Sequence, residues 1–254
     1  MQGMRVNRLM LTNDEKILVS GHIGEVCLWK SLDLVKLSSI PDKLETGLPS
    51  SVGHHQAASC SCLAISHSTD LKPQFLFTAC YNDERDCDIR RWHLQVLEKP
   101  RCVATSQDEV SFLPIFNLEL SPNGAKLLTA HSGGRICMWS ADSMKLEKSI
   151  SVFSGSVSIT SVVTDREWTT FAAFSNSESM HLGIICYDLI KCEEVQRFVC
   201  DALPQRMVYS SDGSYLFAGY NDGCVRKWNI STGQMHLVFR SGWNEEHSRS
   251  CTIC

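Results

Sequence analysis

Three features are missing from this sequence, and each absence excludes a class of protein. No apolar run approaches the roughly 18 residues of a membrane span, and the opening residues MQGMRVN are polar where a secretory leader would be apolar. The net charge is only −4, with 24 basic residues scattered along the chain. Because phosphate binding needs a basic patch, we expect neither DNA nor RNA as the main partner, and no membrane span.

Catalytic motifs are missing as well. The chain has no Gly-x-Ser-x-Gly elbow and no Walker loop, and its carboxylates fall mostly in expected turns. At 254 residues, with 43% hydrophobic and 20% charged residues, it can fold as one large globular domain. We therefore interpret it as a non-enzyme without a cofactor, and keep an active site that follows no known motif as an alternative.

A repeated pattern of strand, tight turn and strand ending in tryptophan is the main positive signal. It reads KILVSGHIGEVCLW up to Trp29, KLLTAHSGGRICMW up to Trp139 and YLFAGYNDGCVRKW up to Trp228. Two weaker copies end at Trp92 and at Tyr187, where tyrosine takes the place of tryptophan. The intervals between these five aromatic residues are 63, 47, 48 and 41 residues. A period of this size predicts a repeat architecture.

These copies resemble the WD40-repeat family, whose blades have about 40–45 residues. A further strand precedes each pair, with Asn-Gly or Asp-Gly turns in the third and fifth copies, and a short fourth strand follows each aromatic residue. The resemblance implies an all-β WD40-type β-propeller over residues 1–240, followed by an irregular tail at 241–254. We expect five four-stranded blades at about 4–37, 60–98, 115–148, 157–199 and 205–239.

The resemblance also implies a structural clamp in each blade. In the family a tetrad joins a His, a Ser or Thr, an Asp in the turn and the Trp. The matching residues of the second copy are His54 or His55, Thr78, Asp86 and Trp92. The fifth copy has Asp222 and Trp228, but Ala218 stands where a hydroxyl residue belongs. We therefore expect several blades to lack the hydrogen-bonded clamp and to depend on apolar packing.

The 13 cysteines do not have the pattern of a disulfide framework. Four of them, Cys27, Cys137, Cys186 and Cys224, lie within expected third strands, where single cysteines behave as small hydrophobic residues. We expect reduced thiols and a cytoplasmic or nuclear protein.

Two other cysteine motifs are weaker. Cys60 and Cys62 lie near two histidines, but their spacing is not that of a zinc knuckle, and we expect no metal site. The last four residues place Cys251 in a possible prenylation box, but Thr252 is polar and no polybasic signal precedes it. Chance is the preferred interpretation of this sequence end.

Other proteins are the expected partners, because rigid loops on a propeller bind without a large ordering cost. The family usually docks partners on the turns between second and third strands. The turn residues expected to contact a partner are His22, Arg85, Ser132, Met180 and Asn221. A scaffold is the preferred function. A substrate-receptor or adaptor subunit of a larger complex, such as a ubiquitin ligase or a ribosome-assembly complex, is one alternative, and an enzyme with an active site in the propeller channel is the other.

Two questions stay open at the sequence level. The insertion at 38–59 is rich in proline, glycine and serine, and is either a functional loop or disordered. The five blades either close a small ring or form an incomplete one. An incomplete ring would expose apolar blade faces, and we then expect self-association through exposed blade edges.

Overall fold

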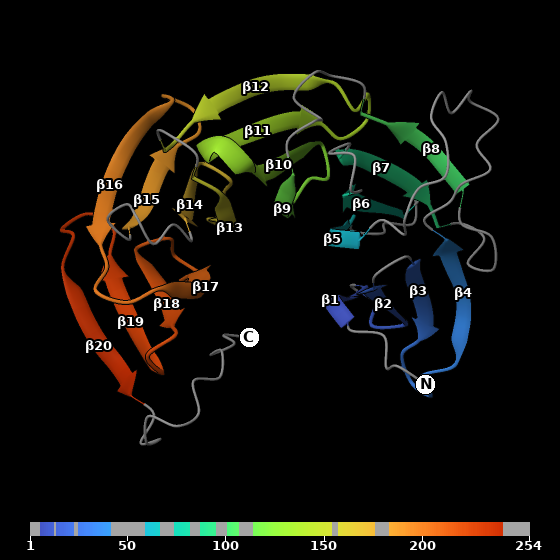
Figure 1. Ribbon diagram of the computed structural model, residues 1–254, viewed down its shortest axis with the longest axis horizontal. Coiled ribbons are helices and arrows are strands. Elements are labelled where there is room, and N and C mark those ends of the chain that lie inside the picture. Colours follow the sequence, from blue (N-terminus) through green and yellow to red (C-terminus); the bar gives the residue numbers. More distant parts are fainter. Residues whose placement is uncertain are drawn as a thin grey trace. The chain divides into compact units, whose positions relative to one another are not determined.

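The computed structural model describes residues 6–12, 14–22, 25–41, 59–66, 74–81, 87–94, 101–106, 114–153, 157–175 and 183–240. Within these ranges the protein consists of five four-stranded antiparallel sheets and one short 3-10 turn, η2 (Ser132–Gly134) (Figure 1). None of the described residues forms a helix that is long and apolar enough to cross a membrane.

Each sheet is a meander of four strands that are consecutive in the chain. We name the sheets blades 1 to 5. Their strands are β1 (Val6–Leu11), β2 (Ile17–His22), β3 (Glu25–Lys30) and β4 (Lys36–Pro41) in blade 1; β5 (Ser59–Ile65), β6 (Phe75–Tyr81), β7 (Cys87–His93) and β8 (Arg101–Thr105) in blade 2; β9 (Ile115–Leu120), β10 (Lys126–His131), β11 (Arg135–Ser140) and β12 (Leu146–Ser151) in blade 3; β13 (Ile159–Thr164), β14 (Thr170–Ser175), β15 (Gly183–Asp188) and β16 (Glu193–Val199) in blade 4; and β17 (Pro204–Tyr209), β18 (Tyr215–Tyr220), β19 (Cys224–Asn229) and β20 (Met235–Arg240) in blade 5.

The repeat predicted these sheets correctly. Each of the five aromatic residues is the last residue but one of a third strand. The glycines of the Asn-Gly and Asp-Gly turns, Gly124, Gly213 and Gly223, all have positive φ angles, as such turns require. The all-β fold class with five four-stranded blades is confirmed.

Three predicted boundaries need correction. Residues 38–41, expected in the insertion, belong to β4, where Ser38 and Ser39 pair with Leu28 and Cys27. The outer strand of blade 2 lies at Arg101–Thr105, beyond the predicted end at 98, and blade 3 continues to Ser151 rather than 148. These outer strands carry many polar residues, so backbone pairing and not apolar patterning defines them. Ser59, the last residue of the predicted insertion, begins β5, and residues 42–58 lie outside the described residues.

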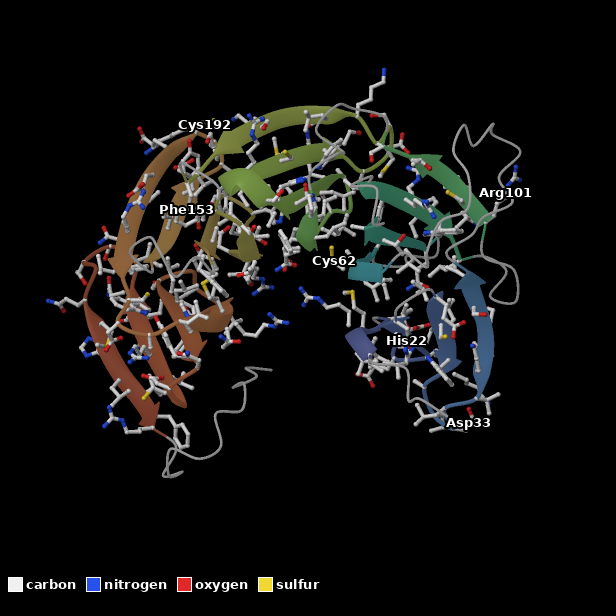
Figure 2. All side chains as sticks on the ribbon, viewed as in Figure 1. His22, Asp33, Cys62, Arg101, Phe153 and Cys192 are labelled. Carbon is white, nitrogen blue, oxygen red and sulfur yellow. The ribbon has the colours of Figure 1, made fainter. Side chains whose placement is uncertain are left out.

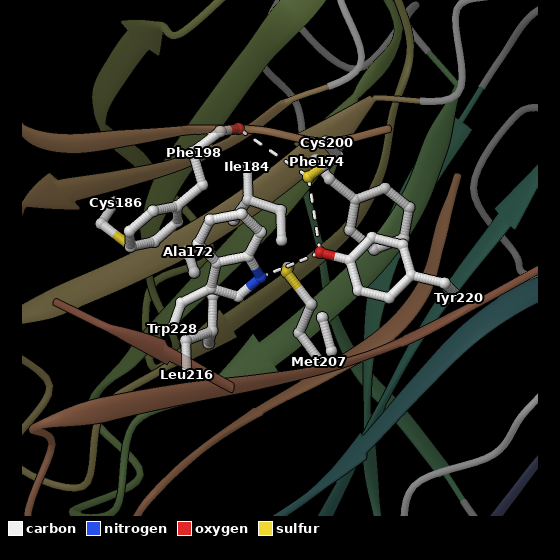
Figure 3. Close-up of a cluster of buried hydrophobic side chains, with 11 residues drawn as sticks. Ala172, Phe174, Ile184, Cys186, Phe198, Cys200, Met207, Leu216, Tyr220 and Trp228 are labelled. Carbon is white, nitrogen blue, oxygen red and sulfur yellow. Dashed lines mark hydrogen bonds between the residues drawn. The ribbon is translucent and has the colours of Figure 1, made fainter. Parts of the chain in front are cut away.

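The chain forms two compact units, which are described separately. The first comprises residues 1–128 and 138–148, and the second residues 129–137 and 149–254. In the first unit, a core cluster joins Val19, Val26, Leu28 and Ile40 of blade 1 to Leu63, Leu76 and Trp92 of blade 2. In the second, Phe198 of blade 4 lies on Trp228 of blade 5, with ring centroids 4.8 Å apart (Figure 3). Each blade therefore buries a face against the next blade of its unit.

Candidate protein-interaction site

A hydrogen bond from the third-strand tryptophan to a hydroxyl on the second strand holds three of the blades. Trp29 Nε1 donates to Ser20 Oγ at 2.7 Å in blade 1, and Trp92 Nε1 donates to Thr78 Oγ1 at 3.0 Å in blade 2. In blade 5 the acceptor is the hydroxyl of a tyrosine. These bonds fix the strands on either side of the turn that is the candidate docking surface.

In blade 1 the clamp contains a histidine from an unexpected position. Ser20 Oγ lies 2.7 Å from His22 Nε2, and both residues are buried on β2. Because a hydroxyl can accept the Trp29 proton and still donate its own, Ser20 can link the indole to the imidazole. Blade 1, whose turn has Gly24 where the family has an aspartate, thus still has a hydrogen-bonded clamp made of Trp29, Ser20 and His22. His22 is a core residue with 7% exposure and not a turn residue.

Blade 5 replaces the missing hydroxyl at Ala218 with one two residues later. Trp228 Nε1 donates to Tyr220 OH at 2.9 Å, and this oxygen lies 3.4 Å from Cys200 Sγ of blade 4 (Figure 3). Burial raises the pKa of Tyr220, so the phenol stays protonated. The expectation that Ala218 leaves this blade without a clamp is therefore wrong.

The sequence signal for these clamps is the residue two places after the expected hydroxyl position. In blade 3 this residue is His131, whose Nε2 lies 2.7 Å from the buried Thr129 Oγ1. In blade 4 the corresponding residues are Ala173 and Ser175, and the side chain of Ser175 lies outside the described residues; Tyr187 OH donates to the backbone oxygen of Cys192. His54, His55 and Asp86, the other predicted tetrad residues of blade 2, lie outside the described residues.

An ion-pair network holds the turn of blade 5. Arg226, whose side chain is 6% exposed, lies 2.6 Å from the Asp222 carboxylate and 3.0 Å from that of Asp201. Its guanidinium also lies 4.2 Å from the centre of the Tyr220 ring. Although burial acts to raise the pKa of Asp222, the hydrogen bonds from Arg226 and from Cys224 N lower it, so the carboxylate is charged. The structural aspartate of this blade therefore pairs with an arginine.

Two glycines with positive φ form the turn of blade 3. Gly133 and Gly134 have φ angles of 73° and 69°. The carbonyl of Gly134 accepts hydrogen bonds from Val152 N at 2.8 Å and Phe153 N at 3.2 Å. A Cβ at Gly134 would collide with the Phe153 backbone, whereas a Cβ at Gly133 would meet nothing. This turn is thus packed against its own blade on one side and open on the other.

The five predicted contact residues have different environments. Asn221 is exposed and its Oδ1 accepts a hydrogen bond from Leu203 N at 3.1 Å, and Ser132 is half-buried in η2. His22 lies in the core (Figure 2). Arg85 and Met180 lie outside the described residues. Partner contact by any of them stays a prediction.

A pocket of about 350 Å³ lies among the inner strands β1, β5 and β9 of the first unit. Leucine, methionine, alanine and isoleucine make up eight of the eleven residues that line it, and Arg8 and Glu119 are the only titratable residues among the eleven. Burial raises the pKa of Glu119 to about 7, and the charge of Arg8 opposes this shift. Sequence patterning could not find this site, because Glu119 looks like any polar residue of an inner strand.

None of the eight cysteines whose side chains the structure describes forms a disulfide, and six of them are buried. Burial raises the pKa of Cys186 to about 12, so this thiol is neutral at physiological pH. Cys62 is buried in β5, and the described residues contain no cluster of three or more side chains that could hold a metal ion. Cys251 and the side chain of Cys60 lie outside the described part of the chain.

Tyr220→Phe is expected to lower the free energy of unfolding by about 1–3 kcal/mol, because it leaves the buried Trp228 N–H without an acceptor. Urea unfolding checks this. The control is Tyr215→Phe, whose ring lies beneath Lys227 on the opposite face of the same strand. Equal losses for the two variants would contradict the clamp.

Glu119→Gln is expected to change how stability depends on pH. In the folded protein the pKa of Glu119 is about 7, whereas its ordinary value is 4.5. Between these two pH values the folded state therefore binds more protons than the unfolded state. Stability of the natural protein therefore falls as pH rises through this window, by about 1–3 kcal/mol, and the Gln variant should lack this loss. Urea midpoints from pH 4.5 to 8 measure it, with the exposed Glu167→Gln as control. Parallel pH profiles for natural protein and Glu119→Gln would contradict it.

Comparison with known families agrees with this architecture. Residues 201–229, which contain β17, β18 and β19, match the WD domain, G-beta repeat. This match and the five four-stranded antiparallel sheets are consistent with a WD40-repeat protein built from propeller blades. No curated protein matches the sequence.

Proposed function

We propose that this chain is a non-catalytic scaffold that binds other proteins through the turns between its second and third strands. WD40 repeats generally mediate protein–protein interaction. The observation that carries the proposal is the blade 5 turn, where the exposed Asn221 and Asp222 stand on a network anchored by the buried Arg226. A turn held in one conformation presents its polar groups without an ordering cost on binding.

The experiment compares two arginine substitutions, in turns at opposite ends of the strands of blade 5. In an antiparallel meander, the turn between the second and third strands and the turn between the first and second lie at opposite ends of the strands. Asn221→Arg alters the first and Ser211→Arg the second, and both residues are exposed. Quantitative affinity purification with each variant should show partners lost from Asn221→Arg and retained by Ser211→Arg. Identical partner sets for both variants would refute a docking role for this turn.

An adaptor subunit of a larger complex is the finer alternative, and it needs a second stable interface. It predicts that the natural chain co-purifies with at least two proteins, of which Asn221→Arg loses one. We further propose a cytoplasmic or nuclear location, which the absence of disulfides among the eight cysteines with described side chains supports. Imaging of the tagged chain tests this location.

One observation favours an enzyme, namely Glu119 with its raised pKa in a pocket beside Arg8. A carboxyl group with pKa about 7 suits proton transfer near neutral pH. However, no second carboxylate or histidine is among the residues that line the pocket, so the usual pairing of an acid with a base is not formed there. The scaffold is therefore the function that the site supports best.

A further inference from the structure

The contacts between consecutive blades within each unit follow one rule. We call the side of a sheet that carries the third-strand aromatic residue its first face, and the opposite side its second face. In blade 1 the second-face residues Val26 and Ile40 pair across β3 and β4 and join the cluster that contains Trp92 of blade 2. In blade 4 the equivalent pair is Ile184 and Phe198, and Phe198 lies on Trp228 of blade 5. The second face of one blade thus receives the first face of the next.

Blade 5 has the same second-face pair without a cover. Val225 and Phe239 pair across β19 and β20 as their equivalents do. Phe239 is 56% exposed, whereas Ile40 and Phe198 are 5% and 2% exposed. Val208 on the same face is 39% exposed. This sheet therefore presents an apolar surface of the type that receives a blade.

Blade 1 has the complementary defect on its first face. Leu9 of β1 is 59% exposed, but Leu63 and Met207, which hold the same register position in blades 2 and 5, are 5% and 6% exposed. Its aromatic residue Trp29 is only half-buried, while Trp92 and Trp228 are 2% and 7% exposed. The first face of blade 1 is thus of the type that another second face covers.

A positively charged residue completes one of the observed contacts. Arg91 of β7 lies 4.6 Å from the centre of the Phe75 ring, and its Nη1 contacts the backbone oxygens of Ala141 and Asp142 at 3.0 and 2.8 Å and the Asp142 carboxylate at 2.8 Å. These acceptors belong to the turn that follows Trp139 in blade 3. A cation on a second face therefore binds the turn after the third strand of the next blade.

Blade 5 repeats this arrangement at the same register positions. Lys227, like Arg91, directly precedes the third-strand tryptophan, and its Nζ lies 3.7 Å from the centre of the Tyr215 ring. The described residues give Lys227 no carboxylate partner. In blade 1 the turn that follows Trp29 carries Asp33, which is exposed and whose carboxylate forms a surface ion pair with Lys30 at 3.1 Å (Figure 2). The two open faces thus match in both apolar character and charge.

We propose that the second face of blade 5 binds the first face of blade 1 of a second copy of this chain. Phe239 and Val225 cover Leu9 and Trp29 of the second copy, and Lys227 binds its turn at Asp33. Because the two surfaces differ, the contact is heterologous and joins copies head to tail. This interface is separate from the turn of Asn221, so substitution there leaves self-association unchanged.

The experiment uses single variants of the full chain and their mixture, studied by sedimentation velocity over a range of concentrations. The natural chain should associate as concentration rises. Phe239→Glu and Leu9→Glu should each weaken association about thirtyfold or more, because each places a charge at the centre of the contact. Mixing the two variants restores one intact contact, from Phe239 of the Leu9→Glu copy to Leu9 of the Phe239→Glu copy, and should yield a 1:1 dimer that does not grow further.

The matched control is Val199→Glu on β16, at an apolar position that is 71% exposed but not on the proposed face. It should associate like the natural chain. Lys227→Glu should weaken association, and mixing it with Asp33→Lys should restore a pair. Circular dichroism checks that each variant is folded.

Three outcomes would overturn the proposal. The first is a natural chain that stays monomeric at all concentrations, as it would if blade 5 were covered within its own chain or left bare. The second is association that Phe239→Glu does not weaken. The third is a mixture of folded variants that stays monomeric.

Discussion

Trp139→Ala is expected to lower the free energy of unfolding by about 3–5 kcal/mol, the usual cost of removing a large aromatic side chain from a core. Trp139 is completely buried, on the third strand of blade 3. A loss of this size is a large share of the roughly 5–15 kcal/mol that stabilises a typical domain. The variant should therefore unfold at a much lower urea concentration than the natural protein.

Urea unfolding followed by circular dichroism measures this loss. The control is Leu32→Ala, in the turn after Trp29, where the side chain is 90% exposed and its removal should change stability by no more than about 0.5 kcal/mol. If the two variants unfolded at the same urea concentration, Trp139 would not be a core residue.

Gly134→Ala should cost about 2–4 kcal/mol, because it combines a left-handed backbone with a steric clash. At φ 69° the added Cβ would meet the carbonyl group of Phe153, which is backbone and cannot rotate away as a side chain could. The strands beside the turn must then separate.

Gly133→Ala is the matched control, since it has nearly the same φ angle of 73° and open space around its Cβ. It should cost only about 1–2 kcal/mol, from the backbone conformation alone. The difference between the two variants isolates the clash. Equal costs would show that the turn of blade 3 is not packed against Phe153.

These two predictions bear on the proposed function because they test how rigidly the candidate docking turns are held. Blade 3 holds its turn by packing at Gly134, and blade 5 by the ion pairs of Arg226. Residues that hold a turn in place, such as Gly134 and Arg226, should affect stability and partner binding together. An exposed residue such as Asn221 should affect binding with a smaller change in stability.

Sequence patterning was most successful where structure depends on local order. The five third strands, their terminal aromatic residues and the glycine turns follow from apolar runs and turn residues, both readable from short segments. The outer strands β4 and β8 were placed less well, because they are held by hydrogen bonds to a neighbouring strand. Ser38 and Ser39 have the composition of a loop, and only their pairing with β3 shows that they belong to a strand.

The clamps were misjudged for a different reason. The family pattern predicts which residue types should meet, but the partner of a buried indole is whichever group the fold brings within reach. Ser20 with His22 and Tyr220 alone both satisfy that need. Residues two apart on a strand lie on the same side of the sheet, as do Ser20 and His22 in β2 and positions 218 and 220 in β18. This spacing can be read from the sequence once the structure shows which groups meet the indole.

The sequence by itself determined the repeat, the number of blades and the strand order within each, because strand pairing in a meander needs only neighbouring segments. Tertiary structure alone decided which of the equivalent residues are covered. Phe198 and Phe239 occupy the same place in two similar outer strands, yet one is buried and the other is 56% exposed. Burial of a sheet face depends on whether another sheet lies against it, and no pattern within the strand itself contains that information.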